Sequence, residues 1–209
     1  LIRPCIYCYV CVSKIFINQP MCCSVNSSMG KEFEDKDLYS KSNKKKNIVV
    51  IGSGPAGMES ARILGERGHM VTVLEKEKDI GGNLRVASLA YEPNQALITY
   101  LKNSLKHLGI NIKTKTKANL EVLKKISPDH VLFATGAKRN APQIPGKELG
   151  HVFDGEELKS LLISSNSKAE KKLNILSRLV LKAGNLSQLL RNISILRILS
   201  KFWMPLKKE

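Results

Sequence analysis

The chain has 209 residues, and a hydrophobic content of 43% is enough for a sizeable core, which argues against general disorder. Its 34 basic and 18 acidic side chains give a net charge of +16, but the basic residues are scattered and aromatic residues make up only 5%, so nucleic-acid binding is not expected. No apolar run approaches the roughly 20 residues that span a bilayer, so stable membrane insertion is not expected either. The opening residues do not have the pattern of a signal peptide. The chain begins at Leu1 rather than Met, which predicts a fragment or a chain whose beginning is missing.

The first notable feature is a group of cysteines at the beginning of the chain. All five lie within the first 23 residues, as Cys5, Cys8, Cys11, Cys22 and Cys23. The short spacing of the first three lets consecutive thiolates converge on one inorganic centre, and a more distant thiolate completes its shell. A 4Fe–4S cluster needs four thiolates, and soft sulfur ligands suit iron, so the pattern predicts an iron–sulfur cluster.

Other states of these cysteines remain open. A four-cysteine zinc site is one, although structural zinc sites usually show two separated Cys-x2-Cys pairs. Disulfide bonds are another, but they need an oxidising compartment, whereas the segment that follows favours the cytoplasm. The cysteines could also carry no ligand. Spacing alone does not choose between Cys22 and Cys23 as the fourth ligand.

A dinucleotide-binding pattern follows the cysteine segment (residues 1–40) and a basic linker (41–46). Residues 47–51 form a short, continuous apolar run, which is typical of a buried parallel strand. The run leads into Gly52-x-Gly54-x-x-Gly57. The first glycine permits a tight turn, the second lets the backbone approach a pyrophosphate, and the third allows close packing of helix on strand. A helix from Ala56 to Arg67 and a second strand at 70–74 are predicted next.

An acidic residue stands at the end of that second strand. Glu75 lies 23 residues after Gly52, where a carboxylate accepts hydrogen bonds from ribose hydroxyls and repels a 2′-phosphate. FAD or NAD is therefore favoured over NADP. The strand, turn, helix and acid together are more specific than an isolated glycine-rich turn, although a turn without a ligand remains the alternative.

The rest of the domain supplies a helix and a strand but no catalytic group. The helix has leucines on one face and a glycine stop, namely Leu97, Leu101, Leu105, Leu108 and Gly109. Alternating lysines predict the exposed face of a strand, at Lys113, Lys115 and Lys117. The four histidines form no constellation with carboxylates or cysteines, and no Ser–His–Asp arrangement is present, so no catalytic residue is assigned.

Two later segments resemble the two-dinucleotide-binding flavoproteins. Residues 79–85, Asp-Ile-Gly-Gly-Asn-Leu-Arg, place paired glycines shortly after the ribose acid. Residues 131–136 end in Ala-Thr-Gly, like the segment that passes beside the flavin in that superfamily. This resemblance implies FAD rather than NAD. The residues expected at the cofactor are Gly52, Gly54, Pro55, Ala56, Gly57, Glu75, Lys76, Gly82, Asn83, Leu84, Ala134, Thr135 and Gly136.

The order of cysteine cluster, linker and FAD-type turn resembles the central part of the Old Yellow Enzyme-related NADH:flavin oxidoreductases with an iron–sulfur cluster. These include bacterial 2,4-dienoyl-CoA reductase, enoate reductase and trimethylamine dehydrogenase. The likeness covers residues 2–163 and includes Ile2 to Cys8, then Cys11, and Cys23 to Glu32. It implies that the cluster is held by Cys5, Cys8, Cys11 and Cys23, which leaves Cys22 as the spare. Ser27 stands where the family has proline, and the two-residue gap between Cys8 and Cys11 looks like the amine-dehydrogenase branch.

The resemblance implies an incomplete α/β, Rossmann-like FAD domain (47–163) and a relay of electrons between NAD(P)H, FAD, the cluster and FMN. In the family a barrel with FMN and the substrate site precedes the cluster, and an NAD(P)H domain follows. We therefore expect an internal fragment that reduces an activated alkene only with those parts, in a cytoplasmic protein that could form homo-oligomers. Residues 164–209 would be a connector with two amphipathic helices between Lys168 and Lys201, packed on the NAD(P)H domain or lying on a membrane surface. An oxidative amine dehydrogenase, a stand-alone FAD and iron–sulfur module, and a basic zinc-binding nucleic-acid module remain alternatives.

Overall fold

The computed structural model describes residues 1–34, 40–137, 143–163 and 172–173. The chain divides into two compact units, residues 1–136 and 137–209. The helices predicted between Lys168 and Lys201 fall almost wholly outside the described residues. Among the described residues, no helix is long and apolar enough to cross a bilayer.

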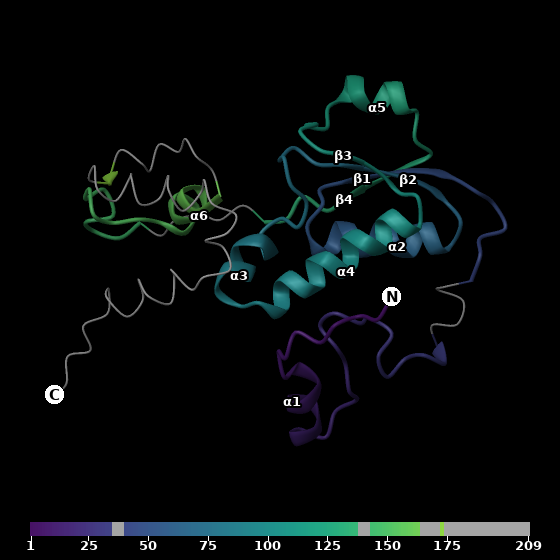
Figure 1. Cartoon of the computed structure of the whole chain (residues 1–209), viewed down its shortest axis with the longest axis horizontal. Helices are drawn as coiled ribbons and strands as arrows, with labels where there is room; N and C mark the ends of the chain where they lie inside the picture. The colour runs from purple at the N-terminus through teal and green to yellow at the C-terminus, as the bar shows by residue number, and fades with distance from the viewer. Residues whose placement is uncertain (35–39, 138–142, 164–171, 174–209) are drawn as a thin grey trace. The chain divides into compact units, whose positions relative to one another are not determined.

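The first unit is built on a parallel sheet of four strands in the order β3-β2-β1-β4 (Figure 1). The strands are β1 (Asn47–Ile51), β2 (Met70–Leu74), β3 (Asn111–Lys113) and β4 (His130–Phe133). The strands predicted at 47–51 and 70–74 are confirmed. The chain passes outward from β1 to β3 and then returns to place β4 on the other side of β1. The strand order therefore reverses beside β1, and ligands of such sheets bind at this point, at the carboxyl ends of the strands.

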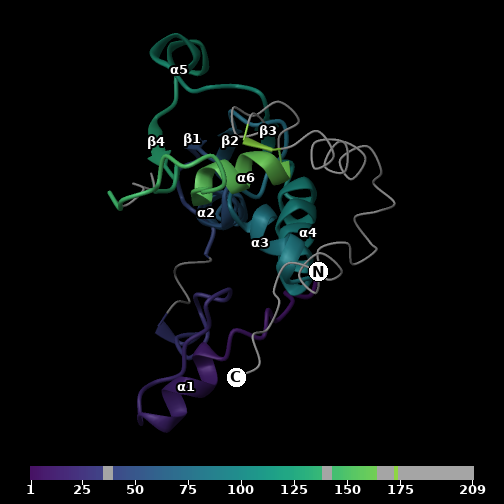
Figure 2. The same ribbon diagram turned by 90° about the vertical axis from the view of Figure 1, so that its left-hand side faces the viewer.

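Helices cover one face of this sheet. Helices α2 (Pro55–Glu66) and α4 (Pro93–His107) lie on that face with α3 (Leu84–Ala90), whereas α5 (Leu120–Ile126) lies on the opposite side (Figures 1 and 2). The predicted leucine face of α4 is confirmed, because Leu97, Leu101 and Leu105 are buried. They pack with strand residues in one core cluster, which includes Val50, Val73 and Met58. Burial of each such side chain contributes about 1.5–3 kcal/mol, so this layer holds β1 and β2 in place.

The lysines after β3 do not continue the strand. Strand β3 ends at Lys113, and Lys115 has a left-handed backbone with φ 53°. The N–H of Lys115 donates to the carbonyl of Glu77 at 2.9 Å, and the N–H of Thr116 donates to the carbonyl of Glu75 at 2.8 Å. The prediction that Lys113, Lys115 and Lys117 share one strand face is thus wrong beyond Lys113, because the chain turns here to pair with the loop after β2.

Residues 1–34 belong to the same compact unit as the sheet. They contain one short helix, α1 (Val10–Phe16), which the sequence pattern did not reveal. Ile6, which lies between Cys5 and Cys8, and Val25, which follows Cys23, pack against the core cluster. The cysteine segment is therefore attached to the dinucleotide-binding layers through apolar contacts as well as through the chain.

In the second unit the described residues centre on helix α6 (Gly155–Ile163). Its start is a reciprocal capping box. Oδ1 of Asp154 accepts hydrogen bonds from the N–H groups of Glu156 and Glu157, at 2.8 and 2.7 Å, and the Glu157 carboxylate accepts from the N–H of Asp154 at 3.0 Å. Lys172 adds an ion pair to Glu157 at 2.8 Å.

Candidate cofactor site

The glycine-rich turn joins β1 to α2 at the carboxyl end of the sheet, and two of its glycines are required by packing. Gly52 has φ +100°, and a Cβ there would lie 2.4 Å from the carbonyl oxygen of Ala134. A Cβ on Gly57 would lie 2.0 Å from the carbonyl oxygen of Gly52. Both contacts are with backbone, which has little freedom to move. The tight turn and the close helix–strand approach expected of these glycines are therefore present.

Gly54 is different, because none of the described residues requires a glycine there. A Cβ at this position would meet none of their atoms within 4 Å, and the backbone has an ordinary φ of −66°. Pro55 opens α2, and the N–H groups of the first turn of a helix have no acceptor within the helix. Open space beside such a turn suits the pyrophosphate of a dinucleotide, so the residues present fit FAD.

Glu75 is buried at the end of β2 and is held by Ser53, the residue after the first glycine. One carboxylate oxygen accepts the N–H of Ser53 at 2.9 Å and its hydroxyl at 2.6 Å, and the other accepts the N–H of Glu77 at 2.9 Å. Burial alone would raise the pKa of Glu75, but these donors outweigh it and hold the pKa below its ordinary value. The predicted ribose acid is thus ionised and fixed beside the turn. Sequence reasoning missed Ser53, whose only signal is a hydroxyl inside the glycine motif.

Because the folded-state pKa of Glu75 is depressed, its stabilising effect is present above the unfolded pKa and is lost as the pH falls through the folded value. We expect Glu75→Gln to lower the free energy of unfolding at pH 7 by about 1.5–3 kcal/mol, the usual worth of hydrogen bonds to a charged group. The difference from wild type should shrink as the pH is lowered from about 5 towards 3. Urea unfolding of the flavin-free protein at several pH values measures both effects.

The matched control for this experiment is Glu77→Gln. Its carboxylate is largely exposed and 3.9 Å from Lys76 Nζ, and its backbone N–H to Glu75 is kept. We expect less than about 0.5 kcal/mol of change for it. A loss in Glu75→Gln that is the same at every pH would contradict the role given to its charge.

The paired glycines and the Ala-Thr-Gly segment also reach the turn. The N–H of Gly81 donates to the carbonyl of Ser53 at 2.8 Å, and a Cβ on Gly82 would lie 3.0 Å from the Cα of Gly54. On the other side, the N–H of Ala134 donates to the carbonyl of Ile51 at 2.8 Å.

The structure therefore brings together most, but not all, of the residues expected at the cofactor. Around the turn it gathers Gly52, Gly54, Pro55, Ala56, Gly57, Glu75, Gly82, Ala134 and Thr135. Asn83 and Leu84 start α3 just beyond the paired glycines. The side chain of Lys76 is exposed, and a Cβ on Gly136 would meet no atom of the described residues within 4 Å.

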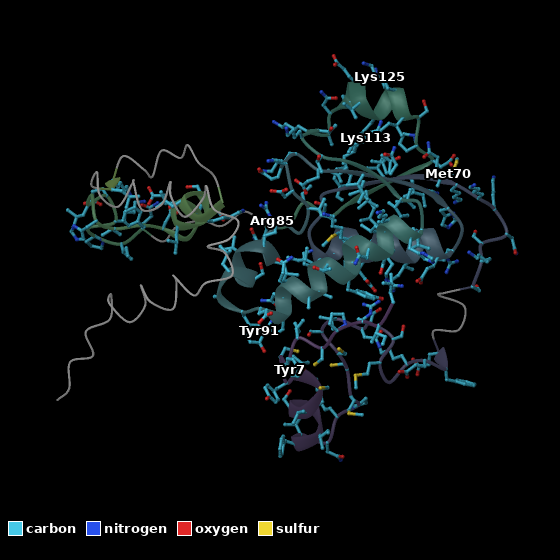
Figure 3. The ribbon with its side chains drawn as sticks, in the orientation of Figure 1. Tyr7, Met70, Arg85, Tyr91, Lys113 and Lys125 are labelled. Atoms are coloured by element: carbon cyan, nitrogen blue, oxygen red, sulfur yellow. The ribbon has the colours of Figure 1, made fainter. Side chains whose placement is uncertain are left out.

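The cysteine segment carries five free thiols, and Figure 3 shows several sulfur atoms in the region of Tyr7. The Sγ of Cys8 lies 2.9 Å from the hydroxyl oxygen of Ser24, which connects the first arm of the segment with the arm that contains Cys22 and Cys23. The hydroxyl of Ser24, followed by the backbone of Val10, lowers the pKa of Cys8 below that of an ordinary thiol. Within the described ranges, however, no three Cys, His, Asp or Glu side chains are arranged as a closed metal-binding group.

The backbone around Cys8 is unusual. Tyr7 and Tyr9 have φ 51° and 58°, a left-handed conformation that costs a bulky residue about 1–2 kcal/mol. Strain of this kind is retained where the surroundings use it. These two residues flank Cys8, and Tyr9 is also the N-cap residue of α1, so α1 begins directly after the Cys8 thiol. An all-thiol donor set in the cysteine segment fits an iron–sulfur cluster.

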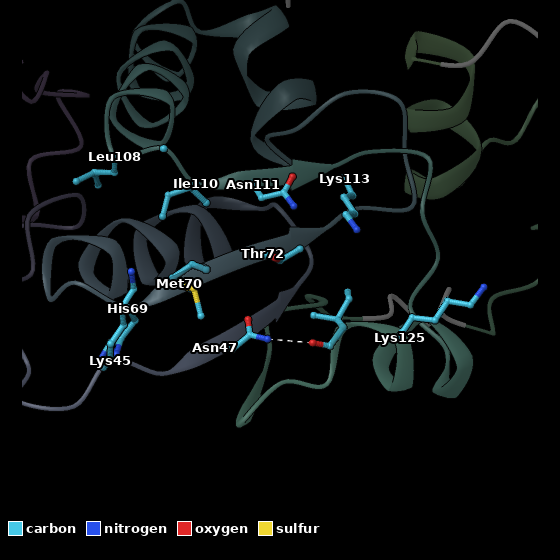
Figure 4. Close-up of a pocket in the computed structure, with 13 residues that line it drawn as sticks. Lys45, Asn47, His69, Met70, Thr72, Leu108, Ile110, Asn111, Lys113 and Lys125 are labelled. Atoms are coloured by element: carbon cyan, nitrogen blue, oxygen red, sulfur yellow. Dashed lines mark hydrogen bonds between the residues drawn. The ribbon is translucent and has the colours of Figure 1, made fainter.

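A hollow of about 560 Å³ lies elsewhere, between α5 and the sheet (Figure 4). It is lined at the amino ends of β1, β2 and β3 by residues that include Asn47, Met70 and Asn111, and by Lys125 and Ile126 of α5. The side-chain amide of Asn47 donates to the carbonyl of Ile126 at 3.0 Å. Since parallel sheets bind their ligands at the opposite, carboxyl ends of the strands, this hollow is not the cofactor site.

The parallel sheet, the switch point beside β1 and the tight glycine-rich turn define an α/β protein with a Rossmann-like, dinucleotide-binding type of domain. The sequence pattern of the pyridine nucleotide-disulphide oxidoreductases matches residues 20–125, half of the chain. The chain belongs to this family, and the match supports the binding of flavin and nucleotide.

Individual relatives show which members of this broad family are similar to the chain. Bilirubin reductase of Mediterraneibacter gnavus is 38% identical over 73% of the chain, and NADH oxidase of Thermoanaerobacter brockii is 35% identical over 73%. The structure of a 2-naphthoyl-CoA reductase complex superimposes with a TM-score of 0.67, at 32% identity over 79% of the chain. The relatives also include dimethylamine dehydrogenase of Hyphomicrobium sp., 30% identical over 75% of the chain.

These matches confirm the resemblance to the Old Yellow Enzyme-related flavin and iron–sulfur oxidoreductases. The chain spans about a quarter of the length of these four proteins, 24% of each.

Proposed function

We propose that the chain is the central part of an NAD(P)H-dependent flavin oxidoreductase that relays electrons to an FMN-containing barrel, where an activated alkene such as an enoyl or dienoyl thioester is reduced. When bound, FAD would accept hydride from NAD(P)H, and a 4Fe–4S cluster would pass electrons singly towards FMN. The observation that carries this proposal is the convergence of the glycine-rich turn, Glu75, the paired glycines and Ala134 at the switch point. The same compact unit contains the segment with the five free cysteines.

The residues of the chain have distinct parts in this proposal. The amides at the start of α2 would bind the pyrophosphate, and the open side of Gly54 would admit it. Glu75, held ionised by Ser53, would accept hydrogen bonds from the ribose hydroxyls. The paired glycines would let residues 79–85 pass close to the cofactor. Cys5, Cys8, Cys11 and Cys23 would hold the cluster.

The names of the relatives support the reductive direction. Two of them are named as reductases, of bilirubin and of 2-naphthoyl-CoA, and a third as an NADH oxidase. The substrate site itself would lie in the barrel, which is why no acid–base residue of this chain has a part in the proposal.

An amine dehydrogenase that runs in the oxidative direction is the second candidate. The two-residue gap between Cys8 and Cys11 favours it, because that spacing looks like the amine-dehydrogenase branch. The relationship to dimethylamine dehydrogenase points the same way. The chemistry of this chain would be the same in both directions, since only the barrel would meet the amine or the alkene.

Cofactor analysis of the whole chain tests the proposal. We would purify the chain without oxygen, add FAD, iron and sulfide, and remove unbound material. Chromatography of the released flavin identifies which flavin stayed bound to the protein. Iron, zinc and acid-labile sulfide contents identify the bound metal centre. We expect FAD in preference to FMN, and iron with sulfide rather than zinc. Zinc without sulfide, together with salt-sensitive binding to DNA or RNA, would instead support the zinc-binding nucleic-acid alternative.

A further inference from the structure

We propose that Arg3 is a positioning residue that binds the cysteine segment to α2 and α4. It would thereby keep the cluster ligands in a fixed geometry relative to the glycine-rich turn at residues 52–57, called the phosphate turn below. The proposal rests on the proposed function for the identity of the two cofactors. The attachment itself follows from contacts within the chain.

One guanidinium contacts three separate parts of the first unit. Nη1 of Arg3 donates to the carbonyl oxygen of Val25, and Nη2 donates to Oε1 of Glu59 at 2.9 Å. The Cζ of Arg3 lies 5.1 Å from the centre of the Tyr100 ring, within the range of a cation–π interaction. The side chain is only 16% exposed, so solvent screens these contacts less than it would on an open surface.

The positions of these partners explain what the contact does. Arg3 precedes Cys5 by two residues, and Val25 follows Cys23 by two residues. The hydrogen bond between them therefore joins the two arms of the cysteine segment independently of any thiol. Val25 also packs against the core cluster, which gives the same junction an apolar contact.

Glu59 is the residue of α2 that Arg3 binds. It lies on α2, the helix that begins at the phosphate turn, and Arg62 holds its carboxylate with donors at 2.8 and 2.9 Å. Burial alone would raise the pKa of Glu59, but Arg62 first and Arg3 second outweigh it and lower this pKa. Glu59 is therefore ionised at neutral pH, and Arg3 docks on a carboxylate whose orientation Arg62 has already set.

The geometry calls for arginine rather than a positive charge alone. A guanidinium is planar and has several donors in a rigid fork, so it can bind a carbonyl and a carboxylate while it stacks on a ring. The ammonium of lysine is a single point on a flexible stem. Arg3→Lys should therefore keep the attraction to Glu59 but lose part of the connection to Val25 and Tyr100.

Hydrogen exchange of the full chain, before any cluster is assembled, tests the attachment. We expect Arg3→Met and Glu59→Gln each to speed exchange at least about tenfold in residues 4–12 and 20–27, with β1 and β2 unchanged. The exchange rate of Arg3→Lys should lie between those of Arg3→Met and wild type. The variant that combines Arg3→Met with Glu59→Gln should exchange no faster than either single variant. Lys14→Met is the matched control, because Lys14 is a cation of the same segment that donates to Gln19 within it, at 2.6 Å.

A second readout separates positioning from general stability. In protein loaded with flavin and cluster, compared at equal iron and flavin content, Arg3→Met should slow single-turnover electron transfer from the reduced flavin to the cluster at least about tenfold. Arg3→Lys should restore part of the rate, and Lys14→Met should match wild type. A merely stabilising residue would leave the rate per loaded molecule unchanged.

Two results would overturn the proposal. One is a hydrogen-exchange rate at residues 4–12 and 20–27 of Arg3→Met that is no faster than in Lys14→Met. The other is an increase in exchange rate that is equally large in β1 and β2. If Arg3→Met does not fold, Arg3→Lys and Glu59→Gln decide the question in the same way. Wild-type protein that binds neither iron nor flavin would contradict the proposed function, but the exchange measurement needs neither and still decides the role of Arg3.

Discussion

Gly54→Ala is expected to weaken FAD binding at least about a hundredfold while the fold keeps its stability, because the new methyl group fills space that only the cofactor would use. In the part of the chain that the structure describes, a Cβ at Gly54 meets no atom within 4 Å, and its φ of −66° suits alanine. Without a clash, replacing glycine stabilises a protein by about 0.4–1 kcal/mol through the unfolded state. Urea unfolding of the flavin-free protein and a flavin titration measure the two quantities separately.

Gly57→Ala is the contrasting variant in the same turn. Its Cβ would lie 2.0 Å from the carbonyl oxygen and 3.0 Å from the carbonyl carbon of Gly52, so the helix must move away from the strand. We expect the free energy of unfolding to fall by about 3 kcal/mol, even without flavin. Equal destabilisation by the two variants would contradict the open space beside Gly54. Normal FAD binding by Gly54→Ala would show that this open side is not where the cofactor binds.

Cys23→Ser is expected to remove most of the iron that the chain takes up on anaerobic reconstitution, whereas Cys22→Ser should keep the wild-type content. A 4Fe–4S cluster needs four thiolates, and a serine hydroxyl is a harder ligand that stays protonated at neutral pH. Metal and sulfide analysis of the two purified variants measures the difference.

The two adjacent cysteines make a well-matched pair for this comparison. Both are half-buried and free, so burial does not distinguish them, and any difference in iron comes from ligation. Ser24, next to Cys23, already contacts the thiol of Cys8. Equal iron loss in both variants would contradict the assignment of Cys22 as the spare, and retention of zinc by both would contradict an iron–sulfur cluster.

The parts of the fold that the sequence predicted are local. The run of β1, turn, α2 and β2 was predictable because apolar periodicity and glycine spacing act over short distances, and the position of Glu75 follows from them. The leucine face of α4 was predictable for the same reason. These elements carry most of the candidate flavin site.

What the sequence did not reveal depends on contacts between distant segments or on unusual backbone. Arg3 reaches Glu59 across 56 residues, and nothing in either local pattern announces the pair. Ser53 meets Glu75 only because β1 and β2 are paired in register. The left-handed backbone of Tyr7 and Tyr9 contradicts the preferences of bulky residues, so no propensity argument predicts it.

The pairing of β4 with β1 bears on the order in which the cofactor site can form. The N–H of Asn47 donates to the carboxylate of Asp129, 82 residues further along the chain, where the two strands begin to pair. Contacts so distant in sequence form late, because a long loop must close before they are made. Ala134, which closes the glycine turn from the side of β4, leaves the ribosome after the phosphate turn and Glu75. During synthesis, FAD would therefore find the glycine-rich turn closed from both sides only once β4 has joined the sheet.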